Sequence, residues 1–242
     1  MIHFFTGKPG NGKSLHMAEI IYREMKKGKN VIANFPVNEG YFENCRHPEK
    51  TGVFLYEPNF YWLNNAYILP GGTSKSCSYS YIDGLYNYAR MFHKRNKKGQ
   101  IIEKQTLLVL DECQELFNNR LWNRKDRLLW TGFFRQHRKL GYEVYLISQD
   151  DKVIDKQIRN VLQFEYEHRA LKYYKAFGKL LSILAGGNLF VVIQKNYSVK
   201  GKDAKTKSSF FKGKKKFYDF YDSYAIFDGE SQGGAQAPDS LT

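Results

Sequence analysis

Apolar runs and helical patterns alternate from the start of the chain. Ile2–Phe5 is a short apolar run followed by Thr6-Gly7, which predicts a buried strand that leads into a loop. Between Lys13 and Lys27 apolar residues recur every three or four positions, which predicts a helix, and Val31–Phe35 predicts a second strand. A strand, a loop, a helix and a strand in this order are typical of a parallel α/β sheet.

The same alternation continues through the middle of the chain. Thr106–Leu110 and Glu143–Ser148 are apolar runs of the kind found in central strands that are buried on both faces. The spacing predicts three further helices and one more strand, namely helices at Ile82–Phe92, Glu115–His137 (in two pieces) and Asp151–Asn160, and a strand at Leu162–Glu167. The pattern therefore predicts an α/β fold with a mainly parallel central sheet flanked by helices.

The pattern changes after His168. Runs rich in aromatic and β-branched residues are separated by glycines and lysines, which predicts an antiparallel β extension. The runs are Tyr173–Phe177, Leu189–Ile193 and Phe217–Tyr221. Gly229–Thr242 is rich in small and polar residues, which predicts a disordered tail or a linker. We therefore expect three parts: a core at 1–170, a β extension at 171–228 and a tail at 229–242.

The composition adds an excess of positive charge to this predicted fold. The chain has 38 lysines and arginines against 24 acids, a net charge of +14, which indicates contact with a polyanion. Residues 195–216 hold nine lysines and one acid, Asp203, with aromatic residues between them. Three interpretations are open for this segment: a single-stranded DNA contact, a patch on an anionic membrane surface, or a solvated loop whose aromatic side chains pack in the β extension.

The cysteines and the hydropathy of the chain indicate the cellular compartment in which it is expected. Cys45, Cys77 and Cys113 are far apart, and none forms a CxxC pair or a zinc-ligand cluster, which favours a reduced, cytosolic protein without a structural metal. The first residues lead directly into a predicted strand and lack a basic and then apolar leader, so no signal peptide is expected. The longest apolar segment, Leu180–Ile193, is interrupted by polar residues and glycines and is too short to span a bilayer as a helix. A cytoplasmic chain without a transmembrane segment is expected.

One loop carries a complete phosphate-binding pattern. Gly7–Ser14 reads GxxxxGK[ST] between a predicted strand and a predicted helix. Glycines in such a loop turn successive N–H groups into one concavity, and the start of the helix adds a partial positive charge. Lys13 would supply a full charge to the β- and γ-phosphates, and the Ser14 hydroxyl would complete the shell of a magnesium ion. We therefore expect ATP and Mg²⁺, with these binding residues: Gly7, Lys8, Pro9, Gly10, Asn11, Gly12, Lys13 and Ser14.

Two acids follow the predicted strand at Thr106–Leu110. Asp111 and Glu112 would lie at the carboxyl end of the sheet, where the ligand crevice of an open α/β sheet lies. Asp111 is expected to hold the magnesium ion, directly or through water, and Glu112 to orient and deprotonate the attacking water. A glutamate there favours hydrolysis over transfer to an acceptor, so a small-molecule kinase is disfavoured. Alternatively, both acids only cap the strand before a turn.

Another polar strand end and several arginines complete the candidate site. Gln149 follows the predicted strand at Glu143–Ser148, where an amide can hydrogen-bond the γ-phosphate or the lytic water; alternatively it only satisfies backbone groups. Arg135, Arg138 and Arg159 lie near the edges of the core. Any of them could stabilise developing charge from a neighbouring subunit, with Arg138 and Arg159 as the first candidates, although each could equally be a surface arginine.

These stretches together resemble the zonular occludens toxin (Zot) domain family, which includes the gene I assembly proteins of filamentous phages. The resemblance rests on FFTGKPGNGKS, VIANFPV, LLVLDECQELF, FRQHRKLGYEVYLISQD and VIDKQIRN. It implies a P-loop ATPase core related to ring-forming translocases, with Lys13 and Ser14 as phosphate and magnesium ligands and Asp111 and Glu112 as the acidic pair. Family members usually continue into a transmembrane helix and a periplasmic domain, so we expect the cytoplasmic part of a longer protein or a variant that borrows its membrane attachment.

The expected function is therefore an ATP-hydrolysing motor for assembly and extrusion of filamentous phage virions at the inner face of the host inner membrane. The expected partners are further copies of the chain in a homo-oligomer and phage coat or assembly proteins. A DNA-translocating or DNA-packaging ATPase is one alternative, because it would share the same site. A nucleotide-dependent switch or scaffold that hydrolyses slowly is an alternative of another class.

Overall fold

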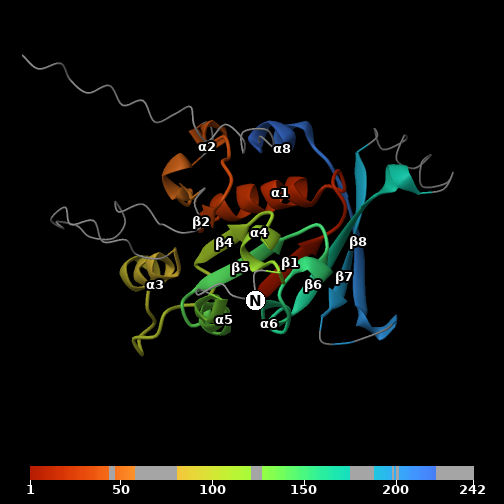
Figure 1. The fold of residues 1–242 in the computed structure, drawn as a ribbon. Helices are drawn as coiled ribbons and strands as arrows, with labels where there is room; N and C mark the ends of the chain where they lie inside the picture. Colours follow the sequence, from red (N-terminus) through yellow and green to blue (C-terminus); the bar gives the residue numbers. More distant parts are fainter. Residues whose placement is uncertain are drawn as a thin grey trace, which may run out of the picture.

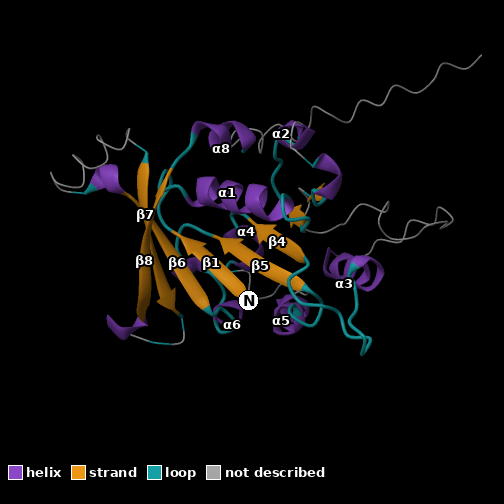
Figure 2. Cartoon of the chain, turned by 180° about the vertical axis from the view of Figure 1, so that it is seen from behind, coloured by secondary structure: helices purple, strands orange, loops and turns teal. Residues whose placement is uncertain are grey.

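The computed structural model describes residues 1–43, 47–57, 81–120, 127–174, 188–197, 199 and 202–221. An eight-stranded sheet crosses the molecule, with helices on both of its faces (Figures 1 and 2). The strands are β1 (Ile2–Thr6), β2 (Asn30–Ala33), β3 (Phe54–Tyr56), β4 (Thr106–Leu110), β5 (Tyr142–Ile147), β6 (Phe164–Ala170), β7 (Leu189–Asn196) and β8 (Lys205–Lys212). Their order across the sheet is β3-β2-β4-β5-β1-β6-β7-β8.

The direction of the strands confirms the predicted fold class. All pairs from β3 to β6 are parallel, and β7 and β8 continue the same sheet as antiparallel strands. β5 lies between β1 and β4, with Leu146 paired to Phe4 on one side and to Leu110 on the other. The carboxyl ends of these three strands therefore lie side by side at one edge of the sheet, which is where open α/β sheets bind their ligands.

Helices cover both faces of the sheet. One face carries α1 (Lys13–Met25), α2 (Gly40–Glu43) and α8 (Lys215–Phe220), and the other carries α3 (Tyr81–Phe92), α5 (Arg127–Gln136) and α6 (Lys156–Arg159), with α4 (Gln114–Phe117) directly after β4 (Figure 2). Successive strand residues enter opposite cores: Phe5 packs in the cluster that contains α1, whereas Phe4 packs in the cluster that contains α5. Burial on both faces explains why the central strands are apolar runs. None of the described helices is long and apolar enough to cross a membrane.

The helix predicted at Asp151–Asn160 is wrong as a single element. A 3-10 helix occupies Asp151–Val153, and α6 begins only at Lys156. Each piece has its own N-terminal cap, because the side chain of Asp150 accepts a hydrogen bond from the N–H of Lys152 and that of Asp155 accepts one from the N–H of Gln157. Two strong caps so close together start two short turns instead of one helix.

The predicted β extension is partly helical. Phe217–Tyr221 was expected to be a strand, but Lys215–Phe220 forms α8, because Phe217 and Phe220 fall on one helical face and are buried against the α1 side of the core. Leu171–Tyr173 forms a 3-10 turn where a strand was expected to begin. Cys113 is a buried free cysteine. Several sequence-based expectations lie outside the described residues: those for 175–177, Cys45, Cys77 and the tail at 229–242.

Candidate phosphate- and metal-binding site

The loop between β1 and α1 requires glycine at two positions. Gly7 and Gly12 have φ angles of +137° and +84°, which L side chains rarely adopt. A Cβ at Gly7 would lie 2.5 Å from the carbonyl oxygen of His168, and a Cβ at Gly12 would lie 2.8 Å from the ring of Phe190. Both glycines are therefore needed for conformational and for steric reasons. They allow the backbone to pass close to its neighbours and to curve into a cradle.

Lys13 is buried inside this cradle. The residue is 7% exposed, and its ammonium group donates hydrogen bonds to the carbonyl oxygens of Gly7 (2.7 Å) and Lys8 (3.5 Å). Burial lowers the pKa of Lys13, while the nearby carboxylates of Asp111 and Glu112 raise it. Within the described part of the chain, no carboxylate forms an ion pair with Lys13. A buried cation whose hydrogen bonds in this part of the chain go to neutral carbonyl oxygens fits a phosphate group as its partner.

Ser14 and Asp111 bring the two sequence motifs together. The Ser14 hydroxyl donates a hydrogen bond to Asp111 Oδ2 (3.0 Å), although the residues are 97 positions apart. Asp111 is buried, and this burial raises the pKa of its carboxyl group. Its other oxygen, Oδ1, accepts a hydrogen bond from the N–H of Glu112 (2.8 Å). A hydroxyl beside a carboxylate is a pair of oxygens suited to Mg²⁺.

The two oxygen donors do not form a complete metal site by themselves. Among the described residues, no group of three or more His, Cys, Asp and Glu side chains gathers in a way that could hold a metal ion. Mg²⁺ typically takes one or two protein oxygens and completes its shell with water and substrate phosphates. The residues present therefore fit a magnesium ion that binds together with a nucleotide.

Asn34 is a residue of this site that the sequence patterns did not reveal. Its side chain forms two hydrogen bonds with the backbone of Asp111: Nδ2 donates to the carbonyl oxygen (2.9 Å), and Oδ1 accepts from the N–H (2.7 Å). This clamp joins the end of β2 to the end of β4 and fixes the backbone that carries the carboxylate. The sequence does hold one signal that could have identified Asn34: it is a polar residue directly after a buried strand, as Asp111 is.

Glu112 has an unusual backbone conformation. Its φ angle is +47°, in the left-handed region that non-glycine residues rarely occupy. Its side chain is half-buried, and Oε2 accepts a hydrogen bond from the side-chain amide of Gln114, a second contact missed from sequence. Strained backbone of this kind concentrates at functional sites, where the surrounding structure holds it in place.

A cleft of about 840 Å³ opens beside the phosphate-binding loop. Lys8 and Pro9 line one side of it, and Gln149, Tyr173 and Tyr174 also line it. This volume lies within the usual range for small-molecule sites. Gln149 follows β5, as predicted, and is exposed; its carbonyl oxygen accepts a hydrogen bond from the N–H of Gly7 (3.4 Å).

The rest of the loop is divided between an exposed tip and a buried anchor. Lys8, Pro9 and Gly10 are exposed, whereas Asn11 is buried. The side-chain oxygen of Asn11 accepts a hydrogen bond from the N–H of Ala170 at 3.3 Å. The anchor ties the loop to the end of β6 and leaves its tip open to the cleft.

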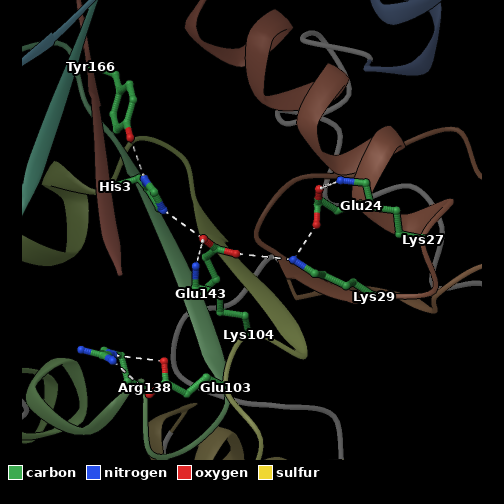
Figure 3. Close-up of polar contacts among 9 residues, drawn as sticks. All are labelled: His3, Glu24, Lys27, Lys29, Glu103, Lys104, Arg138, Glu143 and Tyr166. Atoms are coloured by element: carbon green, nitrogen blue, oxygen red, sulfur yellow. Dashed lines mark hydrogen bonds and ion pairs between the residues drawn. The ribbon is translucent and has the colours of Figure 1, made fainter. Parts of the chain in front are cut away.

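The candidate arginines do not gather at the loop of their own chain. Arg138 precedes β5 and therefore lies at the amino edge of the sheet, where its guanidinium donates to Glu103 (3.0 and 3.2 Å; Figure 3). Arg135 is exposed at the end of α5. Arg159 is partly buried at the end of α6 and interacts with the side chain of Tyr197. Any role of Arg138 at a phosphate would thus require a second copy of the chain.

Comparison with known sequences relates this chain to one protein family and to phage proteins. The Zot family model, described as zonular occludens toxin, matches residues 82–225, which is more than half of the chain. The Gene 1 protein of Enterobacteria phage M13 is 27% identical over 191 residues, which cover 78% of this chain and 48% of that protein. The Gene 1 protein of Enterobacteria phage I2-2 is 29% identical over 191 residues, which cover 78% and 46%. The chain spans about half the length of these curated relatives.

Solved structures share the fold. The N-terminal domain of zonular occludens toxin from Neisseria meningitidis aligns with a TM-score of 0.52 and 18% identity over 91% of this chain and 97% of that domain. The ATPase domain of the protein called G40P aligns with a TM-score of 0.50 and 10% identity over 91% of this chain and 83% of that one. The core therefore has the fold of P-loop NTPases, and the chain belongs to the zonular occludens toxin (Zot) family.

Proposed function

We propose that this chain is a magnesium-dependent P-loop ATPase that drives assembly and extrusion of filamentous phage virions. The observation that supports this most is the hydrogen bond between Ser14 and Asp111, formed beside the buried charge of Lys13. These are the groups that a nucleoside triphosphate and its metal ion require from a P-loop protein. Membership of the Zot family and the similarity to Gene 1 proteins of phages support the role in phage assembly.

In the proposed reaction, Lys13 and the backbone N–H groups of the loop bind the β- and γ-phosphates of ATP. Ser14 and Asp111 would hold Mg²⁺, which supplies charge neutralisation at the phosphates. Glu112 orients a water molecule and accepts its proton. Because Oε2 of Glu112 already accepts from Gln114, we assign the water to Oε1.

The remaining groups are proposed to complete the site in a homo-oligomer. Gln149 would hydrogen-bond the γ-phosphate or the water from the end of β5. Arg138 or Arg159 of a neighbouring copy would stabilise the charge that develops on the transferred phosphoryl group. Arg138 is suited to this because it is exposed and, among the residues that the structure describes, forms its ion pair with Glu103, itself an exposed residue. An exposed ion pair of this kind costs little to exchange for another partner.

We further propose that the motor acts at the inner face of the host inner membrane, with coat or assembly proteins as partners. The exposed lysines of β8 support contact with anionic lipid headgroups at that surface. The alternative of a DNA-translocating ATPase is favoured by one observation: Phe210 is 66% exposed between these lysines, where its ring could stack on an unpaired base.

Substitution of Lys13 tests the proposal. Lys13→Ala is expected to reduce nucleotide affinity by at least about 100-fold and to abolish hydrolysis, because the ammonium group of Lys13 is the buried positive charge that we assign to the β- and γ-phosphates. Calorimetry with ATP and phosphate release measure the two effects. Lys97→Ala, an exposed lysine in the turn after α3, is the matched control and should resemble the unchanged chain.

The outcomes separate the candidate functions. An unchanged chain that binds no ATP in the presence of Mg²⁺ would refute the proposal. Hydrolysis that is stimulated by coat proteins or anionic membranes supports the assembly motor, whereas strong stimulation by single-stranded DNA alone supports a DNA translocase. Tight nucleotide binding without turnover under all of these conditions supports a switch or scaffold.

A further inference from the structure

The segment that follows β8 returns to the candidate metal site. Tyr221 is 8% exposed, and its hydroxyl group donates to Asp111 Oδ2 at 3.4 Å, the same oxygen that accepts from Ser14. The Tyr221 hydroxyl also interacts with the Ser14 side chain. A tyrosine 110 positions after Asp111 thus touches both of the oxygen-bearing groups proposed to hold Mg²⁺.

Packing fixes the position of this tyrosine. Its ring lies edge-on against the fully buried ring of Phe35, with centroids 5.1 Å apart. The preceding residue, Phe220, is also fully buried, and its carbonyl oxygen accepts a hydrogen bond from the N–H of Asn38 (2.9 Å). Phe217 packs edge-on against Tyr22 of α1, which holds α8 above that helix (Figure 1). The strap, defined here as residues 213–221, is therefore anchored along its length.

We propose that Tyr221 is a positioning residue of the metal–nucleotide site, through which the strap is coupled to nucleotide binding. This inference rests on the proposed ATPase function. The carboxylate of Asp111 is buried, so its orientation depends on protein donors: the Glu112 N–H at Oδ1 and the hydroxyls of Ser14 and Tyr221 at Oδ2. Hydrogen bonds to a ligating carboxylate fix its direction before the metal ion binds, and their removal commonly weakens metal affinity by about 10- to 100-fold.

The strap also connects the basic strand β8 with the candidate metal site. It begins at Gly213, directly after β8, whose lysines are exposed at the outer edge of the sheet. It ends at Tyr221, against the carboxylate at the centre of the site. A ligand on the basic strand and a nucleotide in the loop therefore act on opposite ends of one packed segment of nine residues, 213–221.

Tyr221→Phe tests the role of the hydroxyl, because phenylalanine keeps the ring that packs on Phe35. We expect the Mg²⁺ concentration needed for half-maximal binding of a fluorescent ATP analogue to rise by about 10-fold. Binding of the same analogue in EDTA should be unchanged, since the hydroxyl of Tyr221 contacts Asp111 and Ser14, the two groups that we assign to the metal ion. Tyr218→Phe, at a 43% exposed tyrosine of α8, is the control and should match the unchanged chain.

A second measurement examines the unchanged chain directly. Amide hydrogen exchange in the strap should slow several-fold when Mg²⁺ is added to the nucleotide-bound chain, compared with the nucleotide in EDTA. Equal exchange in both conditions, or a Mg²⁺ requirement of Tyr221→Phe that is unchanged or lower, would overturn the inference while leaving the ATPase proposal intact. An unchanged chain that binds no nucleotide with Mg²⁺ would overturn both.

Discussion

Individual residues at the carboxyl edge of the sheet carry the chemistry that we propose. Among them Glu112 is distinctive, because its backbone is left-handed and its carboxylate is held by Gln114. A general base that is fixed in this way is positioned before substrate binds, which is what efficient proton transfer requires. The same contact makes Glu112 easy to test, since an amide in its place can still hydrogen-bond to Gln114.

Glu112→Gln is expected to retain ATP binding while hydrolysis falls by about two to four orders of magnitude, because an amide cannot accept the proton of water. Nucleotide binding by calorimetry and phosphate release under single-turnover conditions measure the two effects. Glu115→Gln, the same chemical change at an exposed residue of α4, should leave both unchanged. A variant at Glu112 with near-normal turnover would show that another group is the base.

The residues of the site differ in how visible they are in the sequence. Lys13 and Ser14 are recognisable because the chemistry of a phosphate loop is contained in eight consecutive positions, and Asp111 is recognisable because an acid ends a buried strand. Asn34 and Tyr221 were not predicted, because their roles depend on contacts with residues 77 and 110 positions away. No local pattern encodes such distances.

At the scale of elements, a polar network ties the opposite, amino edge of the sheet together (Figure 3). His3 of β1 lies between Tyr166 of β6 and Glu143 of β5, with both contacts at 3.1 Å. The other carboxylate oxygen of Glu143 pairs with Lys29 (3.5 Å), in the turn that leads into β2. The buried carboxylate of Glu143 on β5 thus connects β1 and the start of β2, and His3 extends the connection to β6.

The network predicts a pH-dependent contribution to stability. Burial alone would raise the pKa of Glu143, but the hydrogen bond from His3 and the charges of Lys29 and Lys104 lower it to about 2. A carboxylate with a lowered pKa stabilises the fold above its unfolded pKa of about 4.5, and this contribution is lost as the pH falls towards 2. Glu143→Gln should therefore reduce the free energy of unfolding by about 2 kcal/mol near neutral pH.

Urea unfolding of the unchanged chain and of Glu143→Gln, followed from about pH 7 to about pH 3, measures this difference. We expect the two stabilities to converge as the pH falls. Glu103→Gln, which breaks an exposed pair with Arg138, is the control and should show little change at any pH. A difference between the Glu143 variant and the unchanged chain that does not depend on pH would indicate a packing effect.

The elements themselves were predictable to different degrees. β1, β4 and β5 are mainly apolar because both of their faces are buried, and this pattern made them recognisable as central strands. α8 was taken for a strand, because a short run of aromatic residues fits either period and only its packing against α1 decides between them. The break before α6 depends on two capping aspartates, a local signal that the apolar spacing hides.

For the whole molecule, the candidate nucleotide site and the basic segment lie at two different edges of the sheet. Nucleotide chemistry is proposed at the carboxyl ends of the central strands, whereas the basic segment forms the last strand of the sheet. β8 is exposed along most of its length, and its lysines are flanked by the exposed ring of Phe210. Lysines on an edge strand discourage pairing with other sheets. The same lysines also provide the charge that an anionic surface would attract.

A triple substitution of Lys205, Lys207 and Lys212 by Gln tests this surface. If β8 binds lipid headgroups, affinity for vesicles that contain anionic lipid should fall by about 100-fold, since each lysine near such a surface contributes about 1 kcal/mol. The matched control is Lys94, Lys97 and Lys98→Gln, which removes the same charge from an exposed turn after α3. Equal losses in both variants would mean that net charge, not β8, attracts the membrane.

If the β8 variant loses binding to single-stranded DNA but not to vesicles, the basic strand belongs to a DNA path, and the motor acts on nucleic acid instead of at a lipid surface.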